Sequence, residues 1–428
     1  MMHRTAQLGS QRIAARIAAR SLSTKRVIQD PNAPVPRQGI ACANRVVVKV
    51  GTAVVAKPDG RLALARMGGL VEEVAQLKRN GKEVMLVSSG AIGVGRWRTG
   101  MKVSDVLPDP DNQIDRQVCA AAGQEVLMST YDMMFQRMGM KCAQVLITQN
   151  DFLNQERYFA LTSTITRLAN LGIIPIINEN DVVTGSHFGD SPQVFKDNDT
   201  LAALIASGTD CDGLALLTDV EGVFDKPPNQ PGAQRIPVYT SKHEVEIGDG
   251  SAMGRGGMGG KIAAACLAAA GGVNTVVASG YDVRNIRGVF QGEDLGTLFE
   301  AKERPTKSQR WLSFFVETAG NVTISDKARH RLMSHPEKAS LTMDDVVNVD
   351  GHFTAMEPIR LLDHTGQEFA RGVSSMGAVD ITESLEGASL GDGLDQSLGE
   401  KMHNLHLMKP GELFVVNRLN GSKPIVAL

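Results

Sequence analysis

A chain of 428 residues with 45 basic and 47 acidic side chains is long enough for two or three domains, and its total charge gives no sign of nucleic-acid binding. The five cysteines lie far apart without a Cys-x-x-Cys pair, which argues against a zinc site or a disulfide framework. No apolar run approaches the roughly 20 residues of a transmembrane helix, so we expect no membrane span.

The N-terminal segment has a basic composition that the rest of the chain lacks. Its first 29 residues include six Lys or Arg and no Asp or Glu, and Arg12, Arg16 and Arg20 recur every four residues. A basic amphipathic segment without acids is typical of a mitochondrial or plastid presequence, and we expect a mitochondrial address. The alternative is a disordered basic tail on a cytoplasmic protein. Together with the prolines that follow, residues 1–43 are predicted to be an extension and linker.

Short apolar runs alternate with helical patterns over residues 44–300. The runs are continuously apolar, as expected for parallel strands whose two faces are covered by helices. They are residues 45–50, 83–88, 143–148, 173–178, 214–219 and 274–279. Between the first two, Leu64, Met67, Leu70 and later apolar residues recur at helical spacing up to Asn80–Gly81. The pattern predicts an α/β fold, an αβα sandwich with a mainly parallel sheet.

The pattern changes after Pro305. Four short strand-like segments, separated by turn residues, are NVTIS, EPIRLL, EFARGV and GELFVV, and a helical stretch lies near residues 326–334. We therefore predict a second, small, β-rich domain over residues 306–420.

A glycine run precedes a helical segment in SAMGRGGMGGKIAAACLAAAGG, residues 251–272. It contains Gly-x-Gly-x-x-Gly, but no strand precedes it, so a dinucleotide-binding motif does not fit. A P-loop does not fit either, because Arg255 and Ile262 stand where it needs Gly and Ser or Thr. The glycines still permit close approach to an anion, and a helix start with Lys261 beside it favours phosphate. The alternative is a loop that only caps the helix.

Polar residues gather where several predicted strands end. Lys49 lies in an otherwise apolar strand, and since a lysine is almost never fully buried without a partner, we expect it to reach an anion at the strand's carboxyl end. Other polar strand ends are Ser88–Gly90, Asn178–Asp181 and Thr218–Asp219. Asp197–Asp199 begin a predicted helix, where ordinary N-capping is the alternative. Because ligands of open α/β sheets bind outside the carboxyl ends of the strands, these clusters together predict one binding site.

In this order and spacing, the segments resemble the glutamate 5-kinases (γ-glutamyl kinases) of the amino-acid kinase family. The resemblance covers about residues 44–300 and rests on VVVKVGTAVV, VSSGAIGVG, INENDVV, KDNDTLAAL, LLTDVEGVF and GRGGMGGK. The kinase half of the bifunctional pyrroline-5-carboxylate synthases is equally similar. Residues 306–420, however, resemble the C-terminal PUA domain of microbial glutamate 5-kinases rather than a reductase, with departures at LTMDDVVNVDG and RGVSSMGAV.

The resemblance implies transfer of the γ-phosphate of ATP, used with Mg²⁺, to the side-chain carboxylate of L-glutamate, the first step of proline biosynthesis. It implies that Lys49 and Lys261 neutralise charge on the transferring phosphoryl group, while Asp199 orients both lysines. The glutamate-binding residues it implies are Ser89, Asp181, Asn198 and nearby Asp197, with backbone donors from Gly51 and Gly90. The ATP-binding residues it implies are Lys49, Thr218, Asp219, Arg255, Gly256, Gly257, Met258, Gly259, Gly260 and Lys261. The nine histidines show no spacing typical of metal ligands, so we expect no metal site built from protein side chains.

Two alternatives stay open. One is another amino-acid kinase that acts on a different carboxylate, for which Asp181 and Asn198 are the discriminating residues. The other is an RNA-binding protein, because PUA-like domains often bind RNA. Residues 306–420 lack a dense basic patch with interleaved aromatics, which argues against RNA binding as the main role. The resemblance further implies a homo-oligomer, feedback inhibition by proline and a glutamyl phosphate reductase as a partner.

Overall fold

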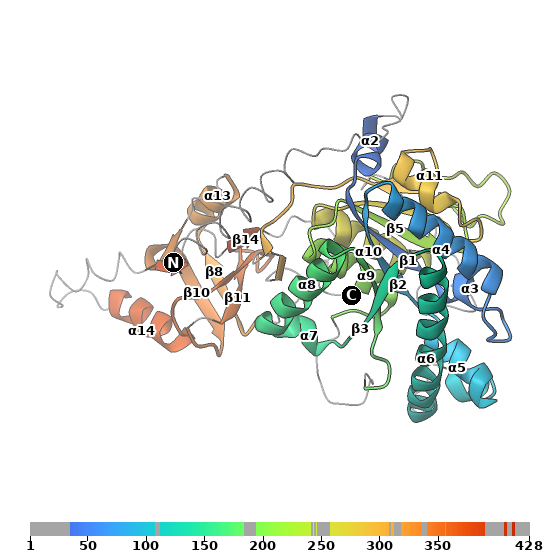
Figure 1. The fold of residues 1–428 in the computed structure, drawn as a ribbon. Coiled ribbons are helices and arrows are strands. Elements are labelled where there is room, and N and C mark those ends of the chain that lie inside the picture. The colour runs from blue at the N-terminus through green and yellow to red at the C-terminus, as the bar shows by residue number, and fades with distance from the viewer. Residues whose placement is uncertain are drawn as a thin grey trace, which may run out of the picture.

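The structure, a computed structural model, contains an N-terminal domain coloured blue to yellow and a C-terminal domain coloured orange to red (Figure 1). The residues that it describes are 35–107, 112–183, 194–240, 243, 245, 257–307, 310–311, 318–334, 340–355, 357–389, 406–408 and 413–415. The predicted presequence lies outside this set. Among the helices of the described residues, none combines the length and the apolar character that crossing a bilayer requires.

A seven-stranded sheet, with the order β3-β4-β2-β1-β5-β6-β7, forms the centre of the N-terminal domain as described. Its strands are β1 (Arg45–Val50), β2 (Glu83–Ser88), β3 (Lys141–Ile147), β4 (Ile173–Glu179), β5 (Gly213–Thr218), β6 (Asn274–Ser279) and β7 (Thr297–Phe299). Neighbouring strands are parallel except for β6 and β7. The predicted α/β fold with a mainly parallel sheet is confirmed, and β7 is an antiparallel edge strand that the sequence did not predict.

Helices pack on both faces of this sheet (Figure 1). They are α2 (Val35–Ala41), α3 (Thr52–Val55), α4 (Leu64–Arg79), α5 (Ala91–Thr99), α6 (Gln113–Arg137), α7 (Asn150–Leu153), α8 (Gln155–Asn170), α9 (Asn198–Gly208), α10 (Met258–Ala270) and α11 (Asn285–Gln291), with a 3₁₀ turn at Ser104–Val106. Apolar side chains of α4, α6 and α11 share one core, and those of α8, α9 and α10 share the core on the opposite face.

Strand β1 shows how the two cores are separated. Successive side chains of a strand point to opposite faces. Accordingly, Val46 and Val48 enter the core shared with α4, whereas Val47 enters the core shared with α9 and α10. Lys49 has the same parity as Val47 and therefore points towards α9 and α10.

The described residues before Asn44 include a helix. Residues 1–43 are predicted to be an extension and linker, but Val35–Ala41 form helix α2. Arg37 in this helix is 2% exposed, donates a 2.6 Å hydrogen bond to the carbonyl oxygen of Leu295 and pairs with Asp294 at 3.1 Å. The prolines suggested a linker, yet proline is tolerated in the first turn of a helix, where its missing N–H has no intrahelical partner to lose.

Helices α5 and α6 cross at very close range through two glycines. A Cβ atom on Gly95 would lie 1.7 Å from the carbonyl oxygen of Cys119, and one on Gly123 would lie 1.8 Å from that of Ala91. No side chain fits at either position. Glycine inside a helix is normally unfavourable, and here it permits the backbone contact that places α6 beside the carboxyl ends of β2 and β4.

The C-terminal domain, as described, has a five-stranded sheet in the order β10-β8-β11-β12-β14 and a two-stranded sheet of β13 and β9. Its elements are β8 (Gly320–Ile324), α13 (Asp326–Ser334), β9 (Leu341–Thr342), a 3₁₀ turn (Met343–Asp345), β10 (Val346–Gly351), β11 (Pro358–Leu362), β12 (Glu368–Val373), α14 (Ala378–Ser389), β13 (His406–Met408) and β14 (Leu413–Val415). Val322, Leu332, Ile359 and Ile381 belong to its single apolar core. The predicted β-rich character is confirmed, and the sequence missed β9, β10, β13 and α14.

Candidate active site

The carboxyl ends of the central strands meet at one edge of the larger sheet. Strand β1 lies in the middle of the order, with β2 on one side and β5 on the other. Chain connections from the centre therefore run in both directions, and such a switch point leaves a crevice where ligands of open α/β sheets bind. The predicted strand-end residues lie at this edge.

A buried carboxylate pairs with two lysines there. The Nζ atom of Lys49, on β1, is 2.6 Å from Oδ1 of Asp199, and the Nζ atom of Lys261 is 2.7 Å from its Oδ2. Asp199 lies in the first turn of α9, and Lys261 lies in the first turn of α10. Their side chains are 6%, 3% and 13% exposed for Lys49, Asp199 and Lys261, so water screens these ion pairs poorly.

This trio of side chains carries one net positive charge. Burial on its own would raise the pKa of Asp199, but Lys49 and Lys261 outweigh burial and hold that pKa below its ordinary value. The carboxylate is therefore ionised at neutral pH and compensates only one of the two ammonium groups. A buried charge without a full counter-charge is costly, so the trio favours a bound anion such as a phosphoryl group.

A network of amide side chains lies next to Asp199. The Nδ2 group of Asn198 donates to Oγ of Ser89 at 2.9 Å and to Oδ1 of Asn178 at 2.8 Å, and Asn178 in turn donates to Gln124 at 2.9 Å. The Oδ1 atom of Asn198 is buried and accepts no hydrogen bond from the described residues. Because an unpaired buried acceptor costs about 1–3 kcal/mol, this oxygen favours a ligand that donates a hydrogen bond.

Two acidic residues and one arginine lie beside this network at the end of β4. Burial, together with the negative charge of Asp181, raises the pKa of Glu179 to about 8, and the positive charge of Arg116 opposes the shift. Burial likewise raises the pKa of Asp181 to about 6, again opposed by Arg116. Arg116 belongs to α6, and the residue is 8% exposed. Near neutral pH, Asp181 is therefore the more strongly ionised of the two carboxyl groups.

Gly51 and Gly90, two of the predicted site residues, shape the backbone after strands β1 and β2. Gly90 caps the N-terminus of α5 in the left-handed region, with φ of 111°, and a Cβ there would lie 2.6 Å from a methyl carbon of Val55. Only glycine fits this position without strain. A Cβ on Gly51 would lie 3.8 Å from the Nζ atom of Lys49, so any side chain at Gly51 would border the lysine ammonium group.

The described part of the glycine run forms the start of α10. Gly257 is its N-cap, and the segment from Met258 through Gly259 and Gly260 to Lys261 makes the first turn. A Cβ on Gly260 would approach Oδ2 of Asp197 to 3.3 Å, which leaves little space for a side chain. The predicted ATP-binding residues Arg255 and Gly256 lie outside the described residues.

Asp197 has an N-capping contact, which is the alternative raised from the sequence. Its Oδ1 atom accepts hydrogen bonds from the backbone N–H (2.8 Å) and the hydroxyl (3.0 Å) of Thr200. At the end of β5, the hydroxyl of Thr218 donates to Oδ1 of Asp219 at 2.9 Å. Asp197 therefore has a structural role in α9, and Asp219 presents its carboxylate at the strand end.

Sequence reasoning missed the contribution of α6. Arg116 and Gln124 approach the site from this helix, and neither belongs to a strand-end motif. They lie two helical turns apart, on the same side as Ala120, because positions i, i+4 and i+8 share a face. Cys119, Ala120 and Leu127 make an apolar face on this helix. The presence of two polar residues on that face is the signal that could have identified Arg116 and Gln124.

Comparisons with known proteins agree with this geometry. The family model described as "Amino acid kinase family" matches residues 44–279, and the PUA domain model matches residues 320–390. The αβα fold and the charged trio at its switch point define a member of a kinase family with an additional β-rich domain. The chain belongs to the amino acid kinase family.

Its relatives fall into two groups by length. A glutamate 5-kinase of Rippkaea orientalis is 37% identical over 362 residues, covering 83% of this chain and 94% of that protein. Delta-1-pyrroline-5-carboxylate synthase 1 of Oryza sativa is 41% identical over 319 residues, or 72% of this chain and 44% of the rice protein. The synthase of Mesembryanthemum crystallinum is 44% identical over 265 residues, or 60% of this chain and 37% of that protein. The chain thus spans less than half the length of the plant synthases it matches and nearly all of the cyanobacterial kinase.

Proposed function

We propose that this protein is a glutamate 5-kinase, which transfers the γ-phosphate of ATP to the side-chain carboxylate of L-glutamate and forms γ-glutamyl phosphate. The observation that carries the proposal is the pairing of Asp199 with Lys49 and Lys261 at the switch point of the sheet. The relatives named glutamate 5-kinase, which match over nearly their full lengths, support the same activity.

The residue types suit phosphoryl transfer to a carboxylate. A carboxylate is already nucleophilic, so the reaction needs no general base and depends on in-line positioning and on positive charge at the phosphoryl oxygens. Lys49 and Lys261 supply that charge. Asp199 holds the two ammonium groups on either side of its carboxylate, so that both are in place before the substrates bind.

The amide network and Asp181 suit the amino-acid end of glutamate. The unpaired Oδ1 atom of Asn198 would accept a hydrogen bond from the α-ammonium group, and ionised Asp181 would attract the same cation. Ser89 and the backbone at Gly51 and Gly90 would contribute donors to the carboxylate groups.

The ATP phosphates would lie between Lys49 and the start of α10, where the glycine run permits close approach and the helix N-terminus favours anions. Thr218 and Asp219 would contact the nucleotide from the end of β5. Within the described residues, no group of three or more His, Cys, Asp or Glu side chains could hold a metal ion. Mg²⁺ is often held largely by substrate phosphates and water, so the donor set fits an ion that enters with ATP and adds positive charge there.

A hydroxamate assay tests the proposed reaction. Purified protein with Mg-ATP, L-glutamate and hydroxylamine should form glutamyl hydroxamate, because hydroxylamine captures an acyl phosphate. Aspartate and N-acetylglutamate serve as controls. Product with either control and none with glutamate would replace the proposal by the alternative amino-acid kinase, and no product with any carboxylate would refute acyl-phosphate formation.

The pKa of Asp181 predicts a pH dependence of glutamate binding. Because this pKa is raised to about 6, the carboxylate loses its negative charge as the pH falls through that value. The glutamate ammonium group stays charged there, so kcat/KM for glutamate should fall by roughly tenfold per pH unit below about pH 6. Initial rates from pH 5 to pH 8 measure this fall in kcat/KM. The fall should be absent in Asp181→Asn, and the same fall in that variant would assign the titration to another group.

The basic N-terminal segment supports a proposal about location. We propose that it directs the protein to mitochondria, because the segment is basic, amphipathic and free of acidic residues. Residues 1–40 fused to a fluorescent reporter should carry it to mitochondria, and replacing Arg12, Arg16 and Arg20 by glutamine should abolish the effect. A diffuse cytosolic signal from the unmodified fusion would contradict the proposal without affecting the kinase assignment.

The chemistry of the product suggests partners. An acyl phosphate hydrolyses readily in water, so we propose that a glutamyl phosphate reductase consumes γ-glutamyl phosphate close to its site of formation. The fused synthases among the relatives are consistent with such a pairing. Feedback inhibition by proline and assembly into a homo-oligomer stay predictions from the family resemblance, and RNA binding by the PUA domain is not part of the proposed role.

A further inference from the structure

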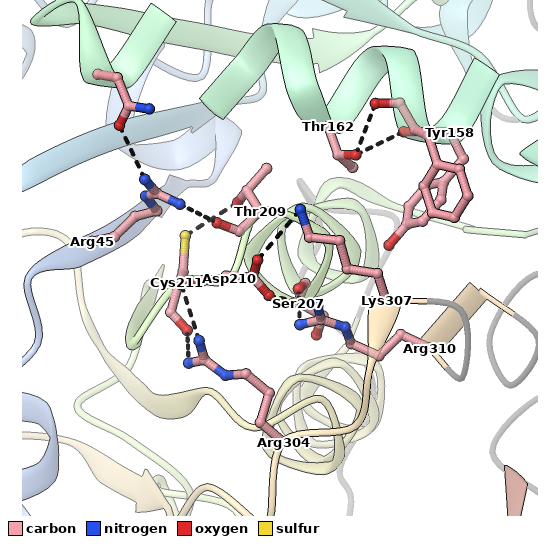
Figure 2. Close-up of polar contacts among 12 residues, drawn as sticks. Arg45, Tyr158, Thr162, Ser207, Thr209, Asp210, Cys211, Arg304, Lys307 and Arg310 are labelled. Carbon is pink, nitrogen blue, oxygen red and sulfur yellow. Dashed lines mark hydrogen bonds and ion pairs between the residues drawn. The ribbon is translucent and has the colours of Figure 1, made fainter. Parts of the chain in front are cut away.

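The segment that leads from the N-terminal to the C-terminal domain makes polar contacts with the C-terminal end of α9 (Figure 2). Arg310 donates hydrogen bonds of 2.5 Å to the carbonyl oxygen of Ser207 and to Oδ1 of Asp210. Lys307 lies 3.5 Å from the other carboxylate oxygen of Asp210. Arg304 donates to the carbonyl oxygens of Asp210 at 3.1 Å and Cys211 at 2.6 Å. We call Arg304, Lys307 and Arg310 the linker clamp.

The central residue of the clamp, Arg310, is buried in the protein interior. The side chain of Arg310 is 2% exposed. The next residue, Trp311, donates from its indole nitrogen to the carbonyl oxygen of Phe152 at 3.0 Å. A buried guanidinium group is costly unless it is paired and hydrogen-bonded, and Asp210 and Ser207 supply those partners. The linker is therefore seated at one defined place on the N-terminal domain.

The turn that receives the clamp has an uncommon backbone. Asp210 has φ of 55°, and it is the one residue other than glycine with positive φ in the described part of the chain. Just before it, a Cβ on Gly208 would lie 2.8 Å from the hydroxyl oxygen of Tyr158 and 2.9 Å from Thr162, so α9 ends in close contact with α8. The clamp thus engages a turn that is already tightly constrained by its neighbours.

The opposite end of the same helix carries the proposed chemistry. Helix α9 begins with Asn198 and Asp199, which contact the amide network and both active-site lysines. At 11 residues it is about 16 Å long, and its residues from Leu201 to Gly208 are buried. A short, fully packed helix shifts as a unit because the close-packed interior does not deform continuously. A displacement of its C-terminal end would therefore also displace Asp199 in its first turn.

We propose that Lys307 and Arg310 are positioning residues, which hold α9 in the register that aligns Asp199 with Lys49 and Lys261 and so tie the C-terminal domain to the active site. Positive charge at the C-terminus of α9 also complements the negative end of the helix dipole. The proposal rests on the proposed function for its kinetic consequence. Its structural part, control of α9 by the linker, stands independently of the reaction.

The test compares Arg310→Ala with a second Arg→Ala variant in the full-length protein. Arg331→Ala removes another Arg–Asp ion pair of 2.5 Å, which a 42% exposed arginine side chain forms with Asp345 inside the C-terminal domain. Hydrogen exchange is followed over residues 198–210, and kcat and KM for glutamate are measured well below the Tm of each variant. For Arg310→Ala we expect faster exchange in α9 and a roughly ten- to hundredfold lower kcat/KM, because small misplacements of a catalytic group have effects of this size.

Two milder variants keep the test decisive if Arg310→Ala does not fold. Arg310→Lys retains the charge but not the two-pronged contact and should restore part of the activity, and Lys307→Ala removes a half-exposed partner and should have a smaller effect in the same direction. The proposal is overturned if these variants lower Tm while α9 exchange and kinetics match the wild type, or if Arg331→Ala changes both equally. If the wild type itself makes no glutamyl hydroxamate, the proposed function fails, and the exchange data alone decide on the clamp.

Discussion

Lys261→Ala and Lys49→Ala should each lower kcat by about 10²–10³, while KM for glutamate changes much less. Each ammonium group is aimed at the place where negative charge develops on the transferring phosphoryl oxygens, and removing one such group from a preorganised site typically has an effect of this size. Asp199 would keep one lysine partner in either variant, so both proteins should fold. Steady-state kinetics by the hydroxamate assay, with thermal unfolding in parallel, measure the effect.

A matched control is Lys141→Ala at the exposed start of the edge strand β3, which should leave kcat unchanged. The double variant of Lys49 and Lys261 should lose less than the product of the two single effects, because residues that act as a unit are not additive. A Lys261→Ala enzyme with near-normal kcat would show that the glycine run only caps α10.

Asp181→Ala should chiefly raise KM for glutamate, by roughly 10- to 100-fold. A hydrogen bond to a charged group is worth about 1.5–3 kcal/mol, and Asp181 is proposed to make this contact with the α-ammonium group rather than with the phosphoryl group. Asn198→Ala should act in the same direction, because its unpaired Oδ1 atom is proposed to accept from the same ammonium group. The measurement is the separation of kcat from KM over a range of glutamate concentrations at saturating ATP.

Asp219→Ala is the comparison for this prediction, since it removes an aspartate from the end of β5, which β2 and β1 separate from β4 in the sheet. It should raise KM for ATP and leave KM for glutamate nearly unchanged. A fall in kcat without any change in KM for glutamate would place Asp181 with the reacting groups instead of the amino-acid pocket.

Much of the fold is encoded in local patterns. Continuous apolar runs predicted the parallel strands, because a strand covered by helices on both faces has no polar side to display. The change to short strands with turn residues predicted the second domain. Two features were missed. Helix α2 was not predicted because of its prolines, which the first turn of a helix tolerates. Helix α6 was not identified as a contributor to the site. Its contact with α5 depends on Gly95 and Gly123, which local propensity counts as unfavourable.

By itself, the sequence determined which residue types are available for chemistry and which strands they follow. It also indicated that Lys49, in an otherwise apolar strand, needs a partner of opposite charge. The family resemblance implies Asp199 as that partner, and only the tertiary structure gives the contact between them. The parity of β1 turns Lys49 towards α9 and α10, and the packing of those two helices brings Asp199 and Lys261 to it. Tertiary packing also separated the capping contact of Asp197 from the ion pairs of Asp199, and seated Arg310 on the far end of the same helix. The capping contact of Asp197 is local, with Thr200 three residues away. The ion pairs of Asp199 and the contacts of Arg310 join residues far apart in the chain, and no local pattern encodes them because their energy arises only when the sheet and its helices have assembled.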